Sequence, residues 1–272
     1  MADQKQGIRP TTYVLQKGEQ TELIDGAVIE EILACIFVNG QELAKFMCTP
    51  HRLDELALGF LRSEGIIQSM DEVELLTISK SSSCVDVWLR HSDFSLPGKP
   101  IITSGCGGGV TFDDLSRPHP SLNTNTTLEP GQIVTLMKRL HLAAELYNEV
   151  RGVHTSALSD GHELLLVAQD VGRHNTIDRL WGQALKQGVQ TGGRILLASG
   201  RISSEMLNKA AKMGVPIIIS RTSPTSLSVE LGRAWHITVI GYARGNSYRV
   251  YTAPERVVSS DALPVEIVAP SS

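Results

Sequence analysis

Apolar and polar positions in the first hundred residues follow the pattern expected for short strands. Two apolar runs within residues 28–48 flank Asn39-Gly40, a pair that tolerates positive φ at both positions and therefore favours a tight hairpin turn. Two further strands are expected at residues 73–78 and 85–89. The pattern predicts a hairpin followed by two more strands in this half of the chain.

One helix is expected among these strands. Apolar residues recur at helical spacing after Thr49-Pro50, where threonine would cap the helix and proline would occupy its first turn. Gly65 is expected to end the helix, because glycine suits the residue that follows a helical C-terminus. This half is therefore predicted to be α+β.

The second half alternates between helical and strand patterns. A long amphipathic helix is expected over residues 130–150. After it, strands are expected at residues 152–158, 163–168, 195–198, 216–219, 237–240 and 248–252, and helices at 176–187, 204–213 and 224–234. Such alternation is typical of α/β proteins, in which helices cover both faces of a parallel or mixed sheet.

A long stretch rich in Gly, Ser, Asn, Thr and Pro separates the two halves. A connection of this length is uncommon inside a compact domain and is usually functional or disordered. The predicted organisation is an N-terminal α+β domain over residues 1–103, a mobile linker over 104–129, a C-terminal α/β domain over 130–258 and a frayed tail over 259–272.

Composition narrows the class of protein. The 272 residues are 42% hydrophobic and carry a net charge of −4, which is ordinary for a globular protein and gives no support for nucleic-acid or membrane-surface binding. No apolar run approaches the roughly 20 residues that a membrane helix needs. The first residues lack the apolar core of a signal peptide, so a cytoplasmic protein is expected.

The four cysteines are far apart and form no C-x-x-C pair, a pattern that fits neither a disulfide scaffold nor a zinc ribbon. Cys35, Cys48 and Cys84 lie in apolar strand patterns and are predicted to pack as small hydrophobic residues. Cys106 differs, because it lies among glycines in the string Ser104 to Gly109. Backbone N–H groups exposed in such a loop stabilise a thiolate, so Cys106 is the candidate reactive residue.

Polar strand-to-helix turns are the candidate binding site. In an α/β sheet, ligands bind beyond the carboxyl ends of the strands. Here the turns after four strands each contain an arginine, and three of these turns lead into a helix. Helix N-termini and arginine both favour phosphate, so the turns together predict a ligand with several phosphates. The candidate residues are Arg173, His174, Asn175, Ser199, Arg201, Arg221, Thr222, Ser223 and the stretch Tyr242, Ala243, Arg244, Gly245, Asn246 and Ser247.

Two histidines lie near these turns. His174, at a predicted helix start, is the better candidate for contacting a ligand or moving a proton, and His154 suits either a functional or a structural role. No spacing of metal ligands is present, so no metal held by protein ligands is expected.

The Gly-Cys-Gly loop, the string Asp170 to Asn175, the Ser199-Gly200-Arg201 turn and the string Ser223 to Leu227 occur in this order in the FdhD family. The chain resembles these formate dehydrogenase accessory sulfurtransferases from about residue 10 to about residue 257.

The resemblance implies a homodimer whose C-terminal part is similar to the cytidine deaminase fold without its zinc site. It implies that a cysteine desulfurase donates sulfur as a persulfide on Cys106. That sulfur would pass to molybdenum bis(guanine dinucleotide) cofactor, held by the stretch Tyr242 to Ser247, before the cofactor enters formate dehydrogenase.

One departure and two alternatives accompany this interpretation. Some family members carry a C-x-x-C pair in the loop, whereas Gly109 stands at the second position here, which leaves Cys106 to carry sulfur alone. A non-catalytic chaperone for the cofactor is one alternative. A cysteine hydrolase acting on a nucleotide, with His154 or His174 as its base, is the other.

Overall fold

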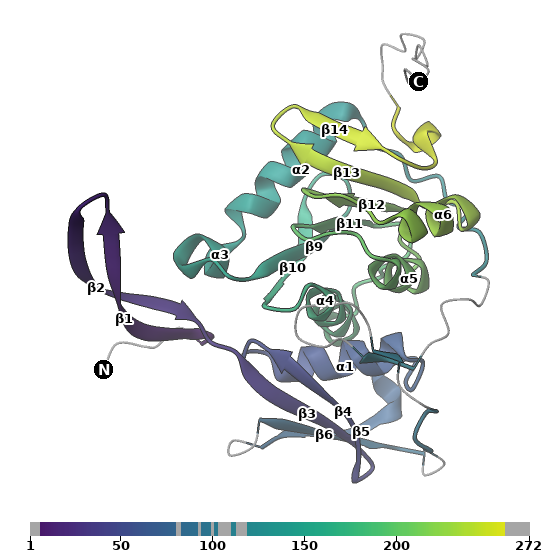
Figure 1. The fold of residues 1–272 in the computed structure, drawn as a ribbon. Coiled ribbons are helices and arrows are strands. Elements are labelled where there is room, and N and C mark those ends of the chain that lie inside the picture. Colours follow the sequence, from purple (N-terminus) through teal and green to yellow (C-terminus); the bar gives the residue numbers. More distant parts are fainter. Residues whose placement is uncertain are drawn as a thin grey trace.

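The computed structural model describes residues 6–79, 83–91, 94–98, 101–102, 110–112 and 119–258. Its first element is a long antiparallel hairpin of β1 (Ile8–Lys17) and β2 (Gln20–Ile29). This hairpin, which the sequence pattern did not predict, extends away from the rest of the molecule (Figure 1).

A four-stranded sheet follows in the strand order β4-β3-β6-β5. Its strands are β3 (Ile32–Val38), β4 (Gln41–Cys48), β5 (Val73–Ile78) and β6 (Cys84–Leu89). The predicted hairpin turn is confirmed, with Asn39 and Gly40 both at positive φ. The sheet buries one face against helix α1 (Leu53–Ser63), so this half is α+β as predicted.

The start of α1 differs from the prediction, because the helix begins at Leu53 and Arg52 occupies the N-cap position in a left-handed conformation. Thr49 is fully buried and contacts a distant part of the chain instead. Its N–H donates to the Asp170 carboxylate at 3.2 Å, and its hydroxyl accepts from the Val171 N–H at 3.2 Å. Thr49 joins the two halves of the protein and does not cap the helix.

Two of the three cysteine predictions in this sheet are wrong. Cys35 on β3 and Cys84 on β6 are in register on neighbouring parallel strands and form a disulfide, with their Cα atoms 4.5 Å apart. Both point away from the core, because the residues that alternate with them along the strands are the buried ones. Cys48 is buried as predicted.

The second large sheet has six strands in the order β10-β9-β11-β12-β13-β14. They are β9 (His154–Ser159), β10 (Leu164–Asp170), β11 (Ile195–Ala198), β12 (Ile217–Ser220), β13 (Thr238–Arg244) and β14 (Ser247–Val250). Because β9 runs antiparallel to both β10 and β11, the carboxyl ends of β10, β11, β12 and β13 lie at one edge.

Helices cover both faces of this sheet, which confirms the predicted α/β class (Figure 1). Helix α2 (Pro130–Leu142) packs on one face. The other face packs against α4 (Arg173–Gln187), α5 (Ser204–Lys212) and α6 (Ser226–Ala234). Short 3-10 helices occur at Met70–Glu72 and Pro254–Arg256. Within the described ranges, no helix has the length and apolar character needed to cross a membrane.

The single helix predicted over residues 130–150 is two helices, α2 and α3 (Glu145–Val150). Side chains replace the backbone hydrogen bonds lost at the break. Asn148 donates to the carbonyl of His141 at 3.1 Å, and Gln169 accepts from the N–H of Leu146 at 3.0 Å. The break separates two helices that both line the cavity described below.

The two halves meet where α1 crosses α4 (Figure 1). Their backbones approach so closely that a Cβ atom built on Gly59 would lie 1.7 Å from the carbonyl oxygen of Asp178. A Cβ atom on Gly182 would lie 1.9 Å from the carbonyl oxygen of Glu55. Only glycine fits at these two positions.

Two short strands, β7 (Ile101–Ile102) and β8 (Val110–Thr111), lie on either side of the predicted Cys106 loop. The Glu64 carboxylate, just after α1, accepts hydrogen bonds from the Thr111 hydroxyl at 3.0 Å and the Phe112 N–H at 2.8 Å. Residues 103–109 lie outside the described residues, and the Cys106 prediction therefore stays a prediction.

Candidate functional site

A cavity of about 330 Å³ opens at the sheet edge where the parallel strands end. Three of its polar residues come from the predicted turns: Ser199 after β11, and Arg221 and Thr222 after β12. Arg244 at the end of β13 joins them, and its Nε donates to the backbone carbonyl of Arg221 at 2.7 Å. The turns converge because parallel strands bring their carboxyl ends to the same edge.

The opposite wall of this first cavity is mainly apolar and aromatic. It comes from α2, α3 and the segment before β9, and includes Leu140, Ala144, Tyr147 and Val153. His154, the first residue of β9, lies between the two walls. The cavity therefore has one cationic, hydroxyl-bearing side and one side suited to an apolar or aromatic group.

A second cavity of about 310 Å³ adjoins the first and shares His141, Arg221 and Arg244 with it. It extends along the predicted binding stretch through Ala243, Gly245 and Asn246, and α2 contributes Lys138. Its remaining lining residues are Val134 and Met137.

The charged side chains that line the two cavities are all cationic. They are Lys138, Arg221 and Arg244, and none of the described residues that line the cavities is an Asp or Glu. Cations without neighbouring carboxylates attract an anion most strongly, since no internal ion pair has to be broken first. This edge of the sheet can bind an anionic ligand longer than a single cavity.

The structure brings together only part of the predicted site. Of the predicted binding residues, Ser199, Arg221, Thr222, Ala243, Arg244, Gly245 and Asn246 line the two cavities, whereas Arg173, His174, Asn175, Arg201, Ser223, Tyr242 and Ser247 do not. Tyr242 is 37% exposed and stacks with Arg249, whose guanidinium carbon lies 4.3 Å from the ring centre.

The string Asp170 to Asn175 has a largely structural role in the part of the chain that is described. Asp170 is fully buried and accepts hydrogen bonds from Asn175 Nδ2 and Arg179 Nε, each at 2.8 Å. Arg179 also donates to backbone carbonyls just before α1, including those of Thr49 at 2.8 Å and Arg52 at 2.9 Å. These bonds hold the turn after β10 against the N-terminal half.

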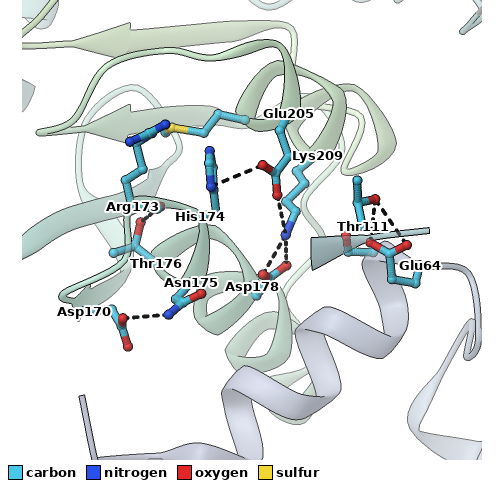
Figure 2. A network of polar contacts seen from close by, with 12 residues as sticks. Glu64, Thr111, Asp170, Arg173, His174, Asn175, Thr176, Asp178, Glu205 and Lys209 are labelled. Atoms are coloured by element: carbon cyan, nitrogen blue, oxygen red, sulfur yellow. Dashed lines mark hydrogen bonds and ion pairs between the residues drawn. The ribbon is translucent and has the colours of Figure 1, made fainter. Parts of the chain in front are cut away.

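His174 begins a buried polar network that continues through Glu205 and Lys209 to Asp178 (Figure 2). Its Nδ1 lies 3.2 Å from the Glu205 carboxylate, and its Nε2 lies 2.9 Å from the Ser203 hydroxyl oxygen. Glu205 lies 3.8 Å from Lys209, which donates to Asp178 at 2.6 and 2.7 Å.

Burial sets the charge states of this network. It lowers the pKa of His174 to about 2, with Lys209 and Arg173 adding to the effect, and together with Arg173 it lowers the pKa of His154. Burial raises the pKa of Asp178 to about 6. Burial alone would lower the pKa of Lys209, but the carboxylates around it outweigh burial and raise it. At neutral pH both histidines are uncharged, and Lys209 and Asp178 form an ion pair.

A lowered histidine pKa predicts how stability depends on pH. In the unfolded chain, His174 binds a proton below the ordinary histidine pKa of 6.5, whereas in the folded protein it stays uncharged at that pH. The contribution of neutral, buried His174 to the free energy of unfolding is therefore fully present above pH 6.5 and is lost as the pH falls. His174→Gln is expected to reduce the acid-side slope of the unfolding free energy by about 1.4 kcal/mol per pH unit. Urea unfolding at several values between neutral and mildly acidic pH measures this slope.

His162→Gln is the matched control for that measurement, because His162 lies exposed in the turn between β9 and β10. It should keep the wild-type slope. An unchanged slope in His174→Gln would show that the fold does not exclude the proton.

Several cavity residues were not predicted from the sequence. They are Val134, Met137, Lys138, Leu140, His141, Ala144, Tyr147, Val153 and Thr155. The pattern of residues 130–150 predicts a helix, but it does not indicate that α2 and α3 face the sheet edge. Only His154, in the strand predicted over residues 152–158, was a candidate from the sequence on this side of the sheet edge.

Comparisons with known proteins agree with this architecture. Residues 29–258 match the model of the FdhD/NarQ family. Two proteins named sulfur carrier protein FdhD, from Staphylococcus aureus strains MRSA252 and Newman, are each 38% identical over 239 residues, covering 86% of this chain and 90% of theirs. A crystal structure of a formate dehydrogenase accessory protein from Desulfotalea psychrophila has a TM-score of 0.78 at 24% identity, covering 93% of this chain and all of that one.

The fold and its cation-lined sheet edge define a mixed α/β protein with two adjoining cavities where the parallel strands end. Because the family model matches most of its length, the chain belongs to the FdhD/NarQ family.

Proposed function

We propose that this protein is a sulfur carrier required for formate dehydrogenase activity. It accepts sulfur from a cysteine desulfurase as a persulfide on Cys106 and passes it to molybdenum bis(guanine dinucleotide) before that cofactor enters formate dehydrogenase. The names of its relatives support the sulfur-carrier role. Under this proposal it is a cytoplasmic sulfurtransferase and acts as a homodimer.

The observation that carries the proposal is the pair of cation-lined cavities at the sheet edge. Arg221 and Arg244 lie where the two cavities meet, and Lys138 extends the positive charge along α2. Pyrophosphate links suit such a surface, because arginine binds phosphate oxygens bidentately. The apolar wall with Tyr147 is suited to a flat aromatic part of the same ligand.

The carrier step uses thiolate chemistry. The Cys106 thiolate attacks the terminal sulfur of the donor's persulfide, a new S–S bond forms, and the donor cysteine leaves as a thiolate. With Gly109 at the place of a second cysteine, no neighbouring thiol in the loop displaces that sulfur as sulfide.

The test separates binding from transfer. Cys106→Ala is expected to bind GDP, a fragment of the cofactor, as tightly as wild type, and yet to yield inactive formate dehydrogenase in cells that have no other copy of the protein. Incubation of the wild type with a desulfurase and cysteine should add the mass of one sulfur at Cys106. Full formate dehydrogenase activity with Cys106→Ala would rule out the carrier role.

A non-catalytic chaperone for the same cofactor is the alternative. It is favoured by the fact that the described residues lining the two cavities include no cysteine. It predicts that Cys106 stays unmodified after incubation with the desulfurase and that Cys106→Ala supports normal activity.

A further inference from the structure

The outer face of the four-stranded sheet carries a pair of cysteines. Cys35 and Cys84 lie directly opposite each other on β3 and β6, and both are partly exposed. The residues around them on this face are also accessible, with Leu33 55% exposed, Trp88 46% and Leu75 52%. Both cysteines therefore lie on a face of the sheet that solvent reaches.

The strand register places the two cysteines side by side for disulfide exchange, in which a thiolate attacks a disulfide. On its other side Cys35 has Lys45 of β4 as its cross-strand neighbour, and the Lys45 ammonium group forms an ion pair with Glu42 at 3.0 Å. The sheet holds the two sulfur atoms together in either redox state, because Cys35 and Cys84 belong to strands that are paired by backbone hydrogen bonds.

We propose that Cys35 and Cys84 form a reversible redox site, a modification site distinct from the sulfur-carrying Cys106 and independent of the proposed function. A low-molecular-weight disulfide is the oxidant. One thiolate attacks it to give a mixed disulfide and releases one thiol. The second cysteine then displaces the other thiol, so that two protein thiols become one disulfide and the oxidant becomes two thiols. A small dithiol reverses both steps.

Oxidation also joins two distant parts of the chain. The disulfide links residues that are 49 positions apart, and the closed segment contains β4, α1 and β5. Closing a segment of this length restricts the unfolded chain and stabilises the fold. The oxidised protein is therefore the more stable form, and the added stability lies in the half that contains α1.

Cys48 provides an internal control. It lies at the end of β4, in the same sheet, but it is fully buried, and burial raises the pKa of its thiol to about 12. It remains protonated and inaccessible while the surface pair reacts.

The experiment uses the full chain with Cys106→Ala, so that the loop cysteine does not contribute. The reduced protein is equilibrated with mixtures of reduced and oxidised glutathione, free thiols are alkylated, and peptides are identified by mass. The expected result is a Cys35–Cys84 linkage that increases with the oxidised fraction, disappears with dithiothreitol under native conditions and leaves Cys48 unchanged. The thermal midpoint should be about 5 °C or more higher in the oxidised form.

Replacing one cysteine of the pair tests whether the two react together. In Cys84→Ser, Cys35 should stop at the mixed disulfide with glutathione and the redox-dependent shift of the thermal midpoint should disappear. Two alkylatable thiols at every glutathione ratio would overturn the proposal. So would a linkage that dithiothreitol cannot reduce in the folded protein, or a thermal midpoint that is the same in both redox states.

Discussion

Gly182→Ala is expected to destabilise the fold by about 3 kcal/mol, because the added methyl group meets backbone and not a movable side chain. The new Cβ atom would lie 1.9 Å from the carbonyl oxygen of Glu55 on α1. Relief requires α1 and α4 to move apart, which would open the packing around Gly59 and the buried hydrogen bonds of Arg179 to the residues before α1. Urea unfolding of the purified variant measures the loss.

Gly131→Ala is the matched control for this prediction, because Gly131 is also a helical glycine but has no atom within 4 Å of a built Cβ. Its unfolding free energy should stay within about 1 kcal/mol of wild type. If Gly182→Ala were as stable as Gly131→Ala, the result would contradict the close backbone contact between α1 and α4.

This crossing also shows a limit of the sequence pattern. Gly59 and Gly182 lie inside predicted helices, where glycine is only a weak negative signal, and nothing local reveals that the two helices touch there. Thr49 failed as a predicted N-cap for the same reason. Its hydroxyl bonds Val171, more than a hundred residues away, and local capping rules do not include that competitor.

The position of the candidate site at one edge of the sheet could be predicted, because the alternation of strand and helix patterns along the sequence is enough to place it there. Consecutive strand and helix patterns imply parallel strands, and parallel strands place the turns that follow them at one edge. The convergence of Ser199, Arg221 and Arg244 on one cavity confirms that inference. Which side chains point into the cavity depends on the orientation of each turn, and the string containing Arg173 and His174 instead packs into the interior.

The cavity residues on α2 could not be predicted from the sequence. Lys138 and His141 are ordinary polar residues of an amphipathic helix, and their role follows only from how α2 lies across the sheet. Similarly, Cys35 and Cys84 each fit the pattern of a strand residue, and only the strand order β3-β6 brings them together. Both cases depend on tertiary register, which periodicity does not encode.

Replacing both Arg221 and Arg244 with alanine is expected to weaken GDP binding by about a thousandfold. A hydrogen bond to a charged group contributes about 1.5–3 kcal/mol, which is about tenfold to a hundredfold per arginine. Each single variant should show a loss in that range. Because Arg244 donates to the backbone of Arg221, the two side chains are neighbours, and the loss in the double variant need not equal the sum of the single losses. Titration calorimetry of the full chain with GDP measures all three.

The control for charge is Arg233→Ala, since Arg233 lies exposed in the last turn of α6 and lines neither cavity. It removes the same formal charge and should leave GDP affinity unchanged. Arg244→Lys tests geometry, because lysine keeps the charge but loses the planar pair of donors, so its affinity should fall between wild type and Arg244→Ala. Equal losses for Arg233→Ala and Arg221→Ala would mean that GDP responds to net charge and not to this site.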